Sequence, residues 1–279
     1  MTSKIPIEDF FEDILGKAMR GLGKGISRLA GECGATPEDI QQLLAGSLND
    51  PQLLRTLALR LGLDPDALVT SAKKEWYPQP VELDGLAQFN TPWTDMWVNA
   101  YLVWDPHTRI AAAFDTGTDA NQILSAAQEH QLKLESVFIT HTHGDHIADL
   151  DTLIKACSPS TAVYSNRLEA LPGTATFDEG TDFAIGDLRM QTLTTSGHSA
   201  GGTTYFIEGL GRPVAIVGDA LFAGSMGGGI ISYQDALENN RKKILTLPAH
   251  TILCHGHGPM STVGEEKAHN PFFPEFKQT

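Results

Sequence analysis

The first 75 residues of the chain place hydrophobic side chains at helical spacing. From Ile7 to Leu15 an apolar residue recurs every three or four positions, which predicts an amphipathic helix. Three further helix starts are marked by a capping Thr or Asp that precedes a proline at the first helical position. These pairs are Thr36-Pro37, Asp50-Pro51 and Asp64-Pro65. We therefore predict a small all-α domain over residues 1–75.

From residue 76 onward the pattern changes to short apolar strands that alternate with helices. Strand-like runs occupy residues 98–104, 110–114, 136–140, 188–194, 203–207, 214–217 and 251–254. Helical spacing is found over residues 120–131, 147–157 and 233–247. Helices that follow strands in this way are typical of α/β layers, so the sequence predicts a larger α/β domain over residues 76–279.

The chain has 279 residues and is acidic, with 20 basic and 34 acidic side chains and a formal net charge of −14. This balance argues against nucleic acid or an anionic membrane as the main partner, because both require clustered Lys and Arg. The three cysteines are scattered, and the N-terminus is acidic where a signal peptide needs an apolar stretch. We expect a cytoplasmic protein that has no membrane span and acts on a small molecule.

A cluster of metal-binding residue types follows the predicted strand at residues 136–140. Imidazole and carboxylate groups are the ligands that hold zinc and related divalent ions. His141 and His143 point the same way in an extended chain, so they can share one ion. A glycine then lets the chain turn, which frees Asp145 and His146 to face a second ion. The alternative is a polar loop with incidental histidines, but three histidines within six positions favour a metal site.

Further candidate ligands occur where three later strands end. His198, Asp219 and His257 each follow a predicted strand and each lie beside glycine. Taken singly, they also fit a loop histidine, a helix cap and a turn histidine. Together with the first cluster they complete a set of seven candidate ligands at strand ends.

At these residues the chain resembles the metallo-β-lactamase superfamily, from about Val81 to Phe273. The first motif of that superfamily, H-x-H-x-D-H, is matched by His141, His143, Asp145 and His146, and its three later ligands by His198, Asp219 and His257. The stretches Gly218–Phe222 and Gly256–Thr262 resemble two sequence phrases of its glyoxalase-II-like members, which are hydroxyacylglutathione hydrolases.

The resemblance implies an αββα sandwich with two metal sites at one edge of its two sheets. Its ligand sets would be His141, His143 and His198 on the first ion, Asp145, His146 and His257 on the second, and Asp219 as the bridge. His255 stands where relatives carry proline, and His257 fits the motif register better. The implied cofactors are two divalent metal ions, zinc in the first place, with iron or manganese as alternatives.

Two neighbouring ions support hydrolysis by a metal-bridging hydroxide. Asp145 can hydrogen-bond that hydroxide and orient it, so it is the predicted catalytic residue. Asp115 lies where relatives carry a strand-end aspartate, and it either holds a ligand histidine or serves only as a turn residue before glycine. Trp93, Trp97 and Met226 are candidate pocket walls, with core packing as the alternative for at least one of these aromatic side chains.

The resemblance predicts a thioester or other carboxylic ester as the substrate. The helical C-terminal extension that helps larger glyoxalase-II enzymes bind glutathione has no counterpart in the 22 residues after His257, and shorter relatives lack it too. The main alternative is a mononuclear iron oxidoreductase of the persulfide dioxygenase type. The stretch Gly224–Gly229 counts against it, because such enzymes show a Gly-Arg-Thr-Asp sequence in that region.

Residues 24–70 resemble a helix-turn-helix domain of the Cro/λ-repressor type in the spacing of helices and turns. The helix that would read DNA, residues 37–45, carries Glu38 and Asp39 and no basic side chain. Such a helix is a poor match for phosphates, so we expect an interaction, homodimerisation or pocket-covering module. A metal-dependent sensor whose N-terminal domain reads DNA is the remaining alternative.

Overall fold

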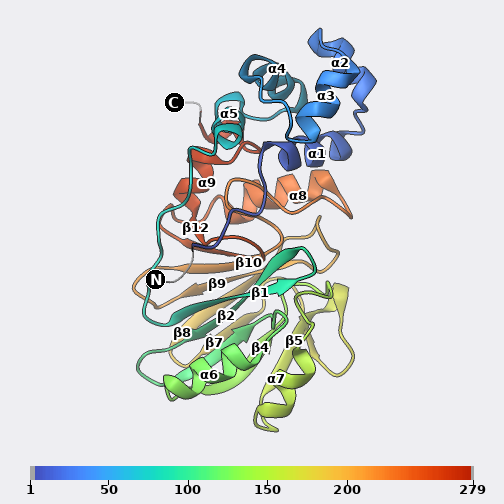
Figure 1. Ribbon diagram of the computed structural model, residues 1–279. Coiled ribbons are helices and arrows are strands. Elements are labelled where there is room, and N and C mark those ends of the chain that lie inside the picture. Colours follow the sequence, from blue (N-terminus) through green and yellow to red (C-terminus); the bar gives the residue numbers. More distant parts are fainter. Residues whose placement is uncertain (1–3, 278–279) are drawn as a thin grey trace.

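The computed structural model describes residues 4–277 and contains two six-stranded sheets packed face to face (Figure 1). Helices cover the outer face of each sheet, and five more helices precede the strands. The predicted fold class, an αββα sandwich preceded by helices, is therefore confirmed. Within residues 4–277 no helix is both long and apolar enough to cross a membrane.

The first sheet has the strand order β1-β2-β3-β4-β5-β6. These strands are β1 (Leu86–Trp93), β2 (Met96–Trp104), β3 (Ile110–Phe114), β4 (Lys133–Phe138), β5 (Ala162–Asn166) and β6 (Ala175–Phe177). The strands from β3 to β6 are parallel, whereas β1 and β2 form an antiparallel hairpin. Helices α6 (Asn121–Glu129) and α7 (Leu150–Ala156) pack on its outer face.

The second sheet has the order β12-β11-β10-β9-β8-β7. Its strands are β7 (Asp182–Ile185), β8 (Leu188–Thr194), β9 (Thr203–Glu208), β10 (Val214–Gly218), β11 (Ile252–His255) and β12 (Ser261–Thr262). All neighbours are antiparallel except β10 and β11. Helices α8 (Tyr233–Asn239) and α9 (Val263–His269) lie on the side of this sheet that faces the N-terminal helices (Figure 1).

The alternation of side chains along β10 explains how the layers pack. Val214 and Ile216 belong to the core between the two sheets. Ala215 and Val217 point the opposite way and join the core beneath α8 and α9. Both faces of this strand are therefore buried, which is why its sequence is apolar throughout.

Some elements differ from the predictions. Strands β1, β5, β6, β7 and β12 were not predicted, since they are short or carry no apolar alternation. The helix predicted over residues 233–247 ends at Asn239 and continues as a π-helical turn, Asn240–Ile244. Trp93 and Trp97, two of the candidate pocket walls, lie in the strands of the β1–β2 hairpin.

The N-terminal helices are α1 (Phe11–Leu22), α2 (Ile26–Cys33), α3 (Pro37–Leu44), α4 (Pro51–Leu61) and α5 (Pro65–Lys73). The three predicted caps are confirmed: the side chains of Thr36, Asp50 and Asp64 each accept a hydrogen bond from a backbone N–H of the following turn. The first helix begins at Phe11 and not at Ile7, so the preceding segment stays outside it.

The packing of these helices is continuous with that of the sandwich. One apolar core contains Leu15 of α1, Leu54 of α4 and Val217 of β10. It also includes Tyr233 of α8, whose ring lies so close to Gly21 that a Cβ there would be 2.2 Å from its Cγ. The helices are thus held on α8 by buried apolar contact.

Candidate metal centre

The candidate ligands come from four chain segments that follow strands. The segment after β4 contributes residues 141–146, and the loop after β8 contributes His198. Asp219 directly follows β10, and His257 follows β11. Because β10 and β11 are parallel neighbours, their carboxyl ends bring Asp219 and His257 to the same edge of the second sheet.

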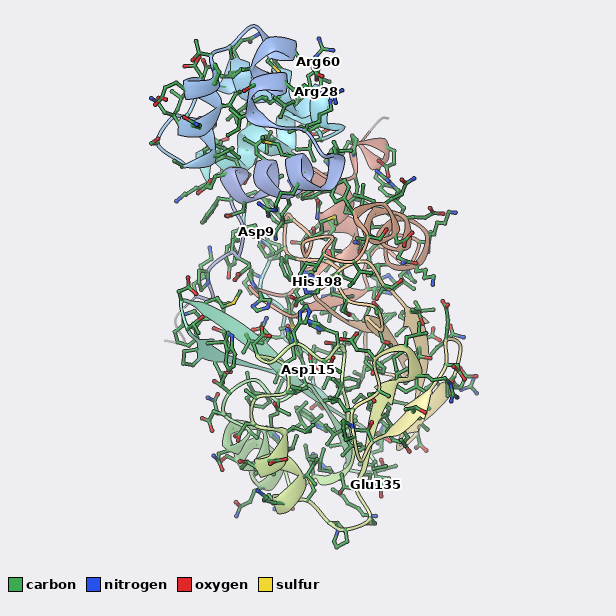
Figure 2. The ribbon with its side chains drawn as sticks, turned by 90° about the vertical axis from the view of Figure 1, so that its right-hand side faces the viewer. Asp9, Arg28, Arg60, Asp115, Glu135 and His198 are labelled. Atoms are coloured by element: carbon green, nitrogen blue, oxygen red, sulfur yellow. The ribbon has the colours of Figure 1, made fainter. Side chains whose placement is uncertain are left out.

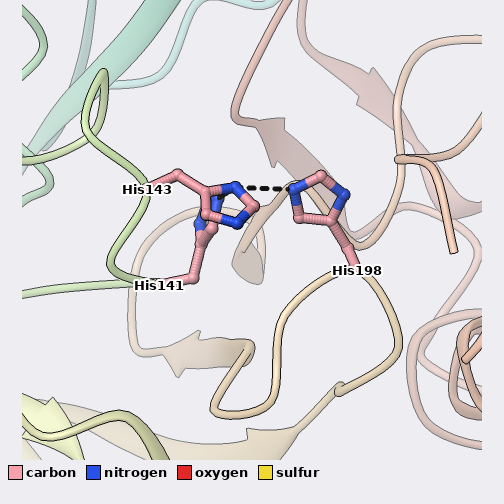
Figure 3. A group of neighbouring side chains, drawn as sticks. All are labelled: His141, His143 and His198. Carbon is pink, nitrogen blue, oxygen red and sulfur yellow. Dashed lines mark hydrogen bonds between the residues drawn. The ribbon is translucent and has the colours of Figure 1, made fainter. Parts of the chain in front are cut away.

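Three imidazoles form the first group, shown in Figure 3. His143 Nδ1 lies 3.1 Å from His141 Nε2 and 3.0 Å from His198 Nε2. His141 is buried, while the other two are partly exposed. Three ring nitrogens that converge in this way have the donor type and spacing for one metal ion.

A second group consists of Asp145, His146 and His257, whose ligand atoms also lie within 4.8 Å of one another. Asp145 Oδ2 is 3.6 Å from His146 Nε2 and 3.3 Å from His257 Nε2. The donor set of two imidazoles and one carboxylate suits a zinc or iron ion. Six of the seven predicted ligands are thus distributed over two groups.

Asp219, the seventh, lies between these groups. Its Oδ2 is 3.3 Å from His198 Nε2 and 3.4 Å from His257 Nε2, and its Oδ1 is 3.3 Å from His146 Nε2. Asp219 Oδ1 and His146 Nε2 are buried and have no hydrogen-bond partner among the described residues. Buried polar atoms are rarely left without a partner, so the arrangement of these two atoms fits bound metal.

In four of the five candidate ligand histidines, a contact at the ring nitrogen Nδ1 orients the imidazole ring. His146 Nδ1 lies 2.8 Å from Asp115 Oδ2, and His141 Nδ1 lies 3.0 Å from Thr140 Oγ1. The Nδ1 atoms of His198 and His257 face the backbone carbonyls of Gly228 and Trp97, at 2.9 and 2.7 Å. Each contact turns Nε2 toward the candidate metal position and favours the tautomer that ligation requires.

Asp115 is central to this support. It is buried and adopts a φ of 56°, so it is both a turn residue and a partner of His146. Its carboxylate also accepts hydrogen bonds from the backbone N–H and the hydroxyl of Thr140, each at 2.7 Å. One side chain therefore orients two segments of the ligand loop.

Glu169 is a supporting residue that the sequence analysis missed. Its carboxylate accepts hydrogen bonds from the backbone N–H of Thr142, at 3.0 Å, and of Gly201, at 2.8 Å. It thereby ties the loop of His141 and His143 to the loop of His198. No sequence signal marks it, because Glu169 lies far along the chain from both loops.

The structure also shows where His255, Trp93 and Trp97 lie relative to the ligand groups. His255 is fully buried and contacts Leu221 O and Ser261 Oγ, at 2.7 and 2.8 Å, so it faces away from the ligand groups. Trp97 is 46% exposed, and its carbonyl carries the contact to His257. The ring of Trp93 lies 3.6 Å from where a Cβ on Gly144 would be, which puts it beside the ligand loop.

Met226 does not fit the prediction. Its side chain is fully buried in the core shared with the N-terminal helices, so it is not a pocket wall. The glycines around it made the segment look like an open loop in the sequence. In the structure this segment is pinned, because the carbonyl of Met226 accepts a hydrogen bond from Lys17 Nζ at 2.9 Å.

The buried carboxylates make this site strongly attractive to positive charge. Burial lowers the pKa of His146, but Asp219 and Asp115 raise it to about 10. Burial likewise lowers the pKa of His257, but Asp219 and Asp145 raise it to about 11. Burial raises the pKa of Asp219, but the neighbouring histidines hold it well below its usual range. Protons on these rings therefore occupy the place that a metal ion would take.

This electrostatic pattern gives a prediction for the metal-free protein. A histidine whose pKa is raised by folding gives its full stabilisation below pH 6.5, which is its pKa in the unfolded chain. This stabilisation is lost as the pH rises toward about 10 for His146 and about 11 for His257. We expect the difference in Tm between metal-loaded and chelator-treated protein to widen by several degrees from pH 6.5 to 9.5. Differential scanning fluorimetry measures it, and a difference that narrows over this range would contradict the charge balance.

The part of the chain that contains the candidate ligands is similar to known proteins. A family model described as the metallo-beta-lactamase superfamily matches residues 93–257. The "Probable metallo-hydrolase YqgX" of Bacillus subtilis (strain 168) is 30% identical over 203 residues, which cover 64% of this chain and 93% of the relative. "Hydroxyacylglutathione hydrolase GloC" of Haemophilus influenzae is 28% identical over 204 residues, which cover 65% of this chain and 95% of the relative.

A solved structure is also similar to this chain. The crystal structure of TTHA1623 in a di-iron-bound form is similar with a TM-score of 0.52 and 25% identity, covering 66% of this chain and 99% of that one. All three matches are nearly full length for the relative and cover about two thirds of this chain. The family match leaves residues 1–92, which include the N-terminal helices, outside it.

Proposed function

The chain belongs to the metallo-beta-lactamase superfamily, a superfamily of metal-dependent hydrolases, and we propose that it is a dinuclear hydrolase of a thioester or other carboxylic ester. The observation that carries the proposal is the position of Asp219 between two groups of three ligands, within 3.4 Å of a histidine from each. A single ion would not need two such groups.

The bound ions would supply a water of lowered pKa and a Lewis acid for the carbonyl oxygen. The chain's own residues fix the geometry around them. Asp145 is the one ligand carboxylate on the more open side, with a side chain 12% exposed against 8% for Asp219. It is therefore the residue best placed to accept a hydrogen bond from the attacking water and hold its orientation.

A thioester is favoured as the substrate by the similarity to hydroxyacylglutathione hydrolases, among them that of Haemophilus influenzae. A carboxylic thioester or ester also suits a site that gathers cations against a developing oxyanion. The native metal is zinc, iron or manganese in this proposal. The di-iron form of a structural relative supports iron as a candidate.

The test combines metal analysis with a substrate panel of thioesters, lactones and phosphodiesters. We expect two ions per chain and the highest kcat/KM on a thioester. One iron per chain, together with oxygen consumption on glutathione persulfide, would overturn the proposal in favour of the mononuclear oxidoreductase. Preference for a phosphodiester would overturn the substrate class and leave the dinuclear centre standing.

For the N-terminal helices we propose a role in the active site in place of DNA binding. Helix α3 carries Glu38 and Asp39 in its first turn and no Lys or Arg. The apolar core that these helices share with α8 supports a fixed position on the catalytic layers. A gel shift with genomic fragments at low salt tests this proposal, and tight, sequence-selective binding would contradict it.

A further inference from the structure

The segment before α1 runs along the edge of the candidate metal centre. Gly258 directly follows the candidate ligand His257, and a Cβ on Gly258 would lie 3.3 Å from Glu8 N and 3.5 Å from Pro6 O. The hydroxyl of Tyr77 donates a hydrogen bond to Ile5 O at 2.7 Å. The segment of residues 5–10 is therefore in direct contact with the loop of the second ligand group.

This segment is anchored next to Glu8. Asp9 is buried, forms an ion pair with Lys17 and accepts a hydrogen bond from Ser225 Oγ at 2.6 Å. Lys17 also donates to the carbonyl of Met226, so α1, the segment and the loop after Asp219 are joined in one polar cluster. Figure 2 shows Asp9 between the N-terminal helices and His198. The backbone of Glu8 is thus held on both sides.

Glu8 itself is half-buried, and its backbone N and its Cβ lie 3.3 and 3.6 Å from the position of a Cβ on Gly258, the residue after His257. Burial raises the pKa of its carboxyl above the usual value, and the charge of His257 only partly opposes this shift. Within residues 4–277 its carboxylate has no hydrogen-bond or ion-pair partner. The nearby ammonium of Lys17 is already engaged by Asp9 and Met226. A carboxylate without a partner at the edge of a catalytic site is available for a ligand.

We propose that Glu8 is a specificity-determining residue, which selects thioesters whose leaving thiol carries a cationic or neutral group and disfavours anionic thiols. The inference rests on the proposed thioester hydrolysis, and on the leaving group lying on the side of His257. A fixed carboxylate attracts a cationic thiol and repels an anionic one. The ratio of kcat/KM for a cationic thioester to kcat/KM for an anionic thioester therefore measures its effect directly. The N-terminal segment, which lies outside the family match, would thus contribute to substrate choice.

Three thioesters with the same acyl group test the proposal: those of thiocholine, of its uncharged isostere 3,3-dimethylbutanethiol, and of 3-mercaptopropionate. Release of free thiol gives kcat/KM for each. We expect the wild-type protein to prefer the thiocholine ester over the mercaptopropionate ester. Glu8→Gln should reduce this ratio roughly five- to tenfold, and Glu8→Lys should invert the preference. The ratio is measured on one sample, so it does not depend on the fraction of folded or metal-loaded protein.

Glu135→Gln is the matched control. Glu135 lies in β4 at the end of the sandwich remote from His198 (Figure 2), and its substitution should leave the ratio unchanged. If Glu8→Gln also leaves the ratio of kcat/KM for the thiocholine and mercaptopropionate esters within twofold of the wild type while thioesters are hydrolysed, the proposed role of Glu8 is wrong. The proposed function is not affected by that result. If the metal-loaded wild type hydrolyses none of the three esters, the thioesterase proposal fails and the Glu8 proposal fails with it.

Discussion

Substitution of Asp219 by alanine is expected to abolish turnover, with a loss of roughly 10²- to 10³-fold or more in kcat/KM. Asp219 is buried between the two ligand groups, within 3.4 Å of His146, His198 and His257. Its removal leaves these imidazoles without the carboxylate that they share. We therefore expect the variant to retain fewer than two ions per chain as well.

Metal analysis and thiol release on the same preparation check this result. Asp178→Ala is the matched control, because Asp178 is an exposed carboxylate that pairs with Arg167 on the surface. It should keep both the metal and the activity. An Asp219→Ala protein with two ions and wild-type turnover would remove the basis for a bridged pair. The substitution tests the site and not the reaction, since a mononuclear oxidoreductase would lose activity too.

The candidate ligands could be predicted from the sequence because their chemistry is visible in the side chains. Histidine and aspartate at strand ends beside glycine give a recognisable pattern, whereas Asp115 was a candidate because of its position in the family resemblance. The carbonyls of Gly228 and Trp97 that orient His198 and His257 could not be predicted. Every residue has a carbonyl, so only the folded backbone decides which one faces a ring.

Among the strands, too, some could be predicted from the sequence and others could not. Strand β10 is apolar and buried throughout, and the buried apolar run of residues 137–139 begins within β4, so both were predicted. In contrast, β1 is a half-buried edge strand with polar residues and Pro92. The role of Met226 was misjudged because the glycines beside it resemble an open loop. Its side chain is buried in a core that it shares with the N-terminal helices, which are distant in sequence.

The change of texture near residue 75 suggests two separate domains, but the packing of the described residues joins them. Leu15 and Leu54 share a core with Val217, two residues before Asp219. Asp9 and Ser225 form a second, polar connection close to the same loop. These contacts give the N-terminal helices a physical link to the metal centre that sequence spacing alone does not reveal.

A methyl group on Gly256 is expected to damage the centre nearly as severely as the loss of Asp219. A Cβ at this position would lie 2.0 Å from Asp219 Oδ1 and 2.8 Å from His146 Cε1. The backbone cannot simply withdraw, because Gly256 N donates to Gly218 O and Gly256 O accepts from Asn99 N, at 2.9 and 2.7 Å. We expect Gly256→Ala to lower kcat/KM by about 100-fold or more, since small displacements of reacting groups have such effects.

The comparison that isolates this steric effect is Gly211→Ala. Gly211 lies in the turn between β9 and β10, where a Cβ would meet only Leu83 at an ordinary 3.7 Å. Neither glycine has a positive φ, so the two substitutions differ in available space and not in backbone strain. Gly211→Ala should keep its metal and its kcat/KM. If Gly256→Ala did so as well, the ligand groups could not be as tightly packed as their distances imply, and the orientation of Asp219 and His146 would not be what limits catalysis.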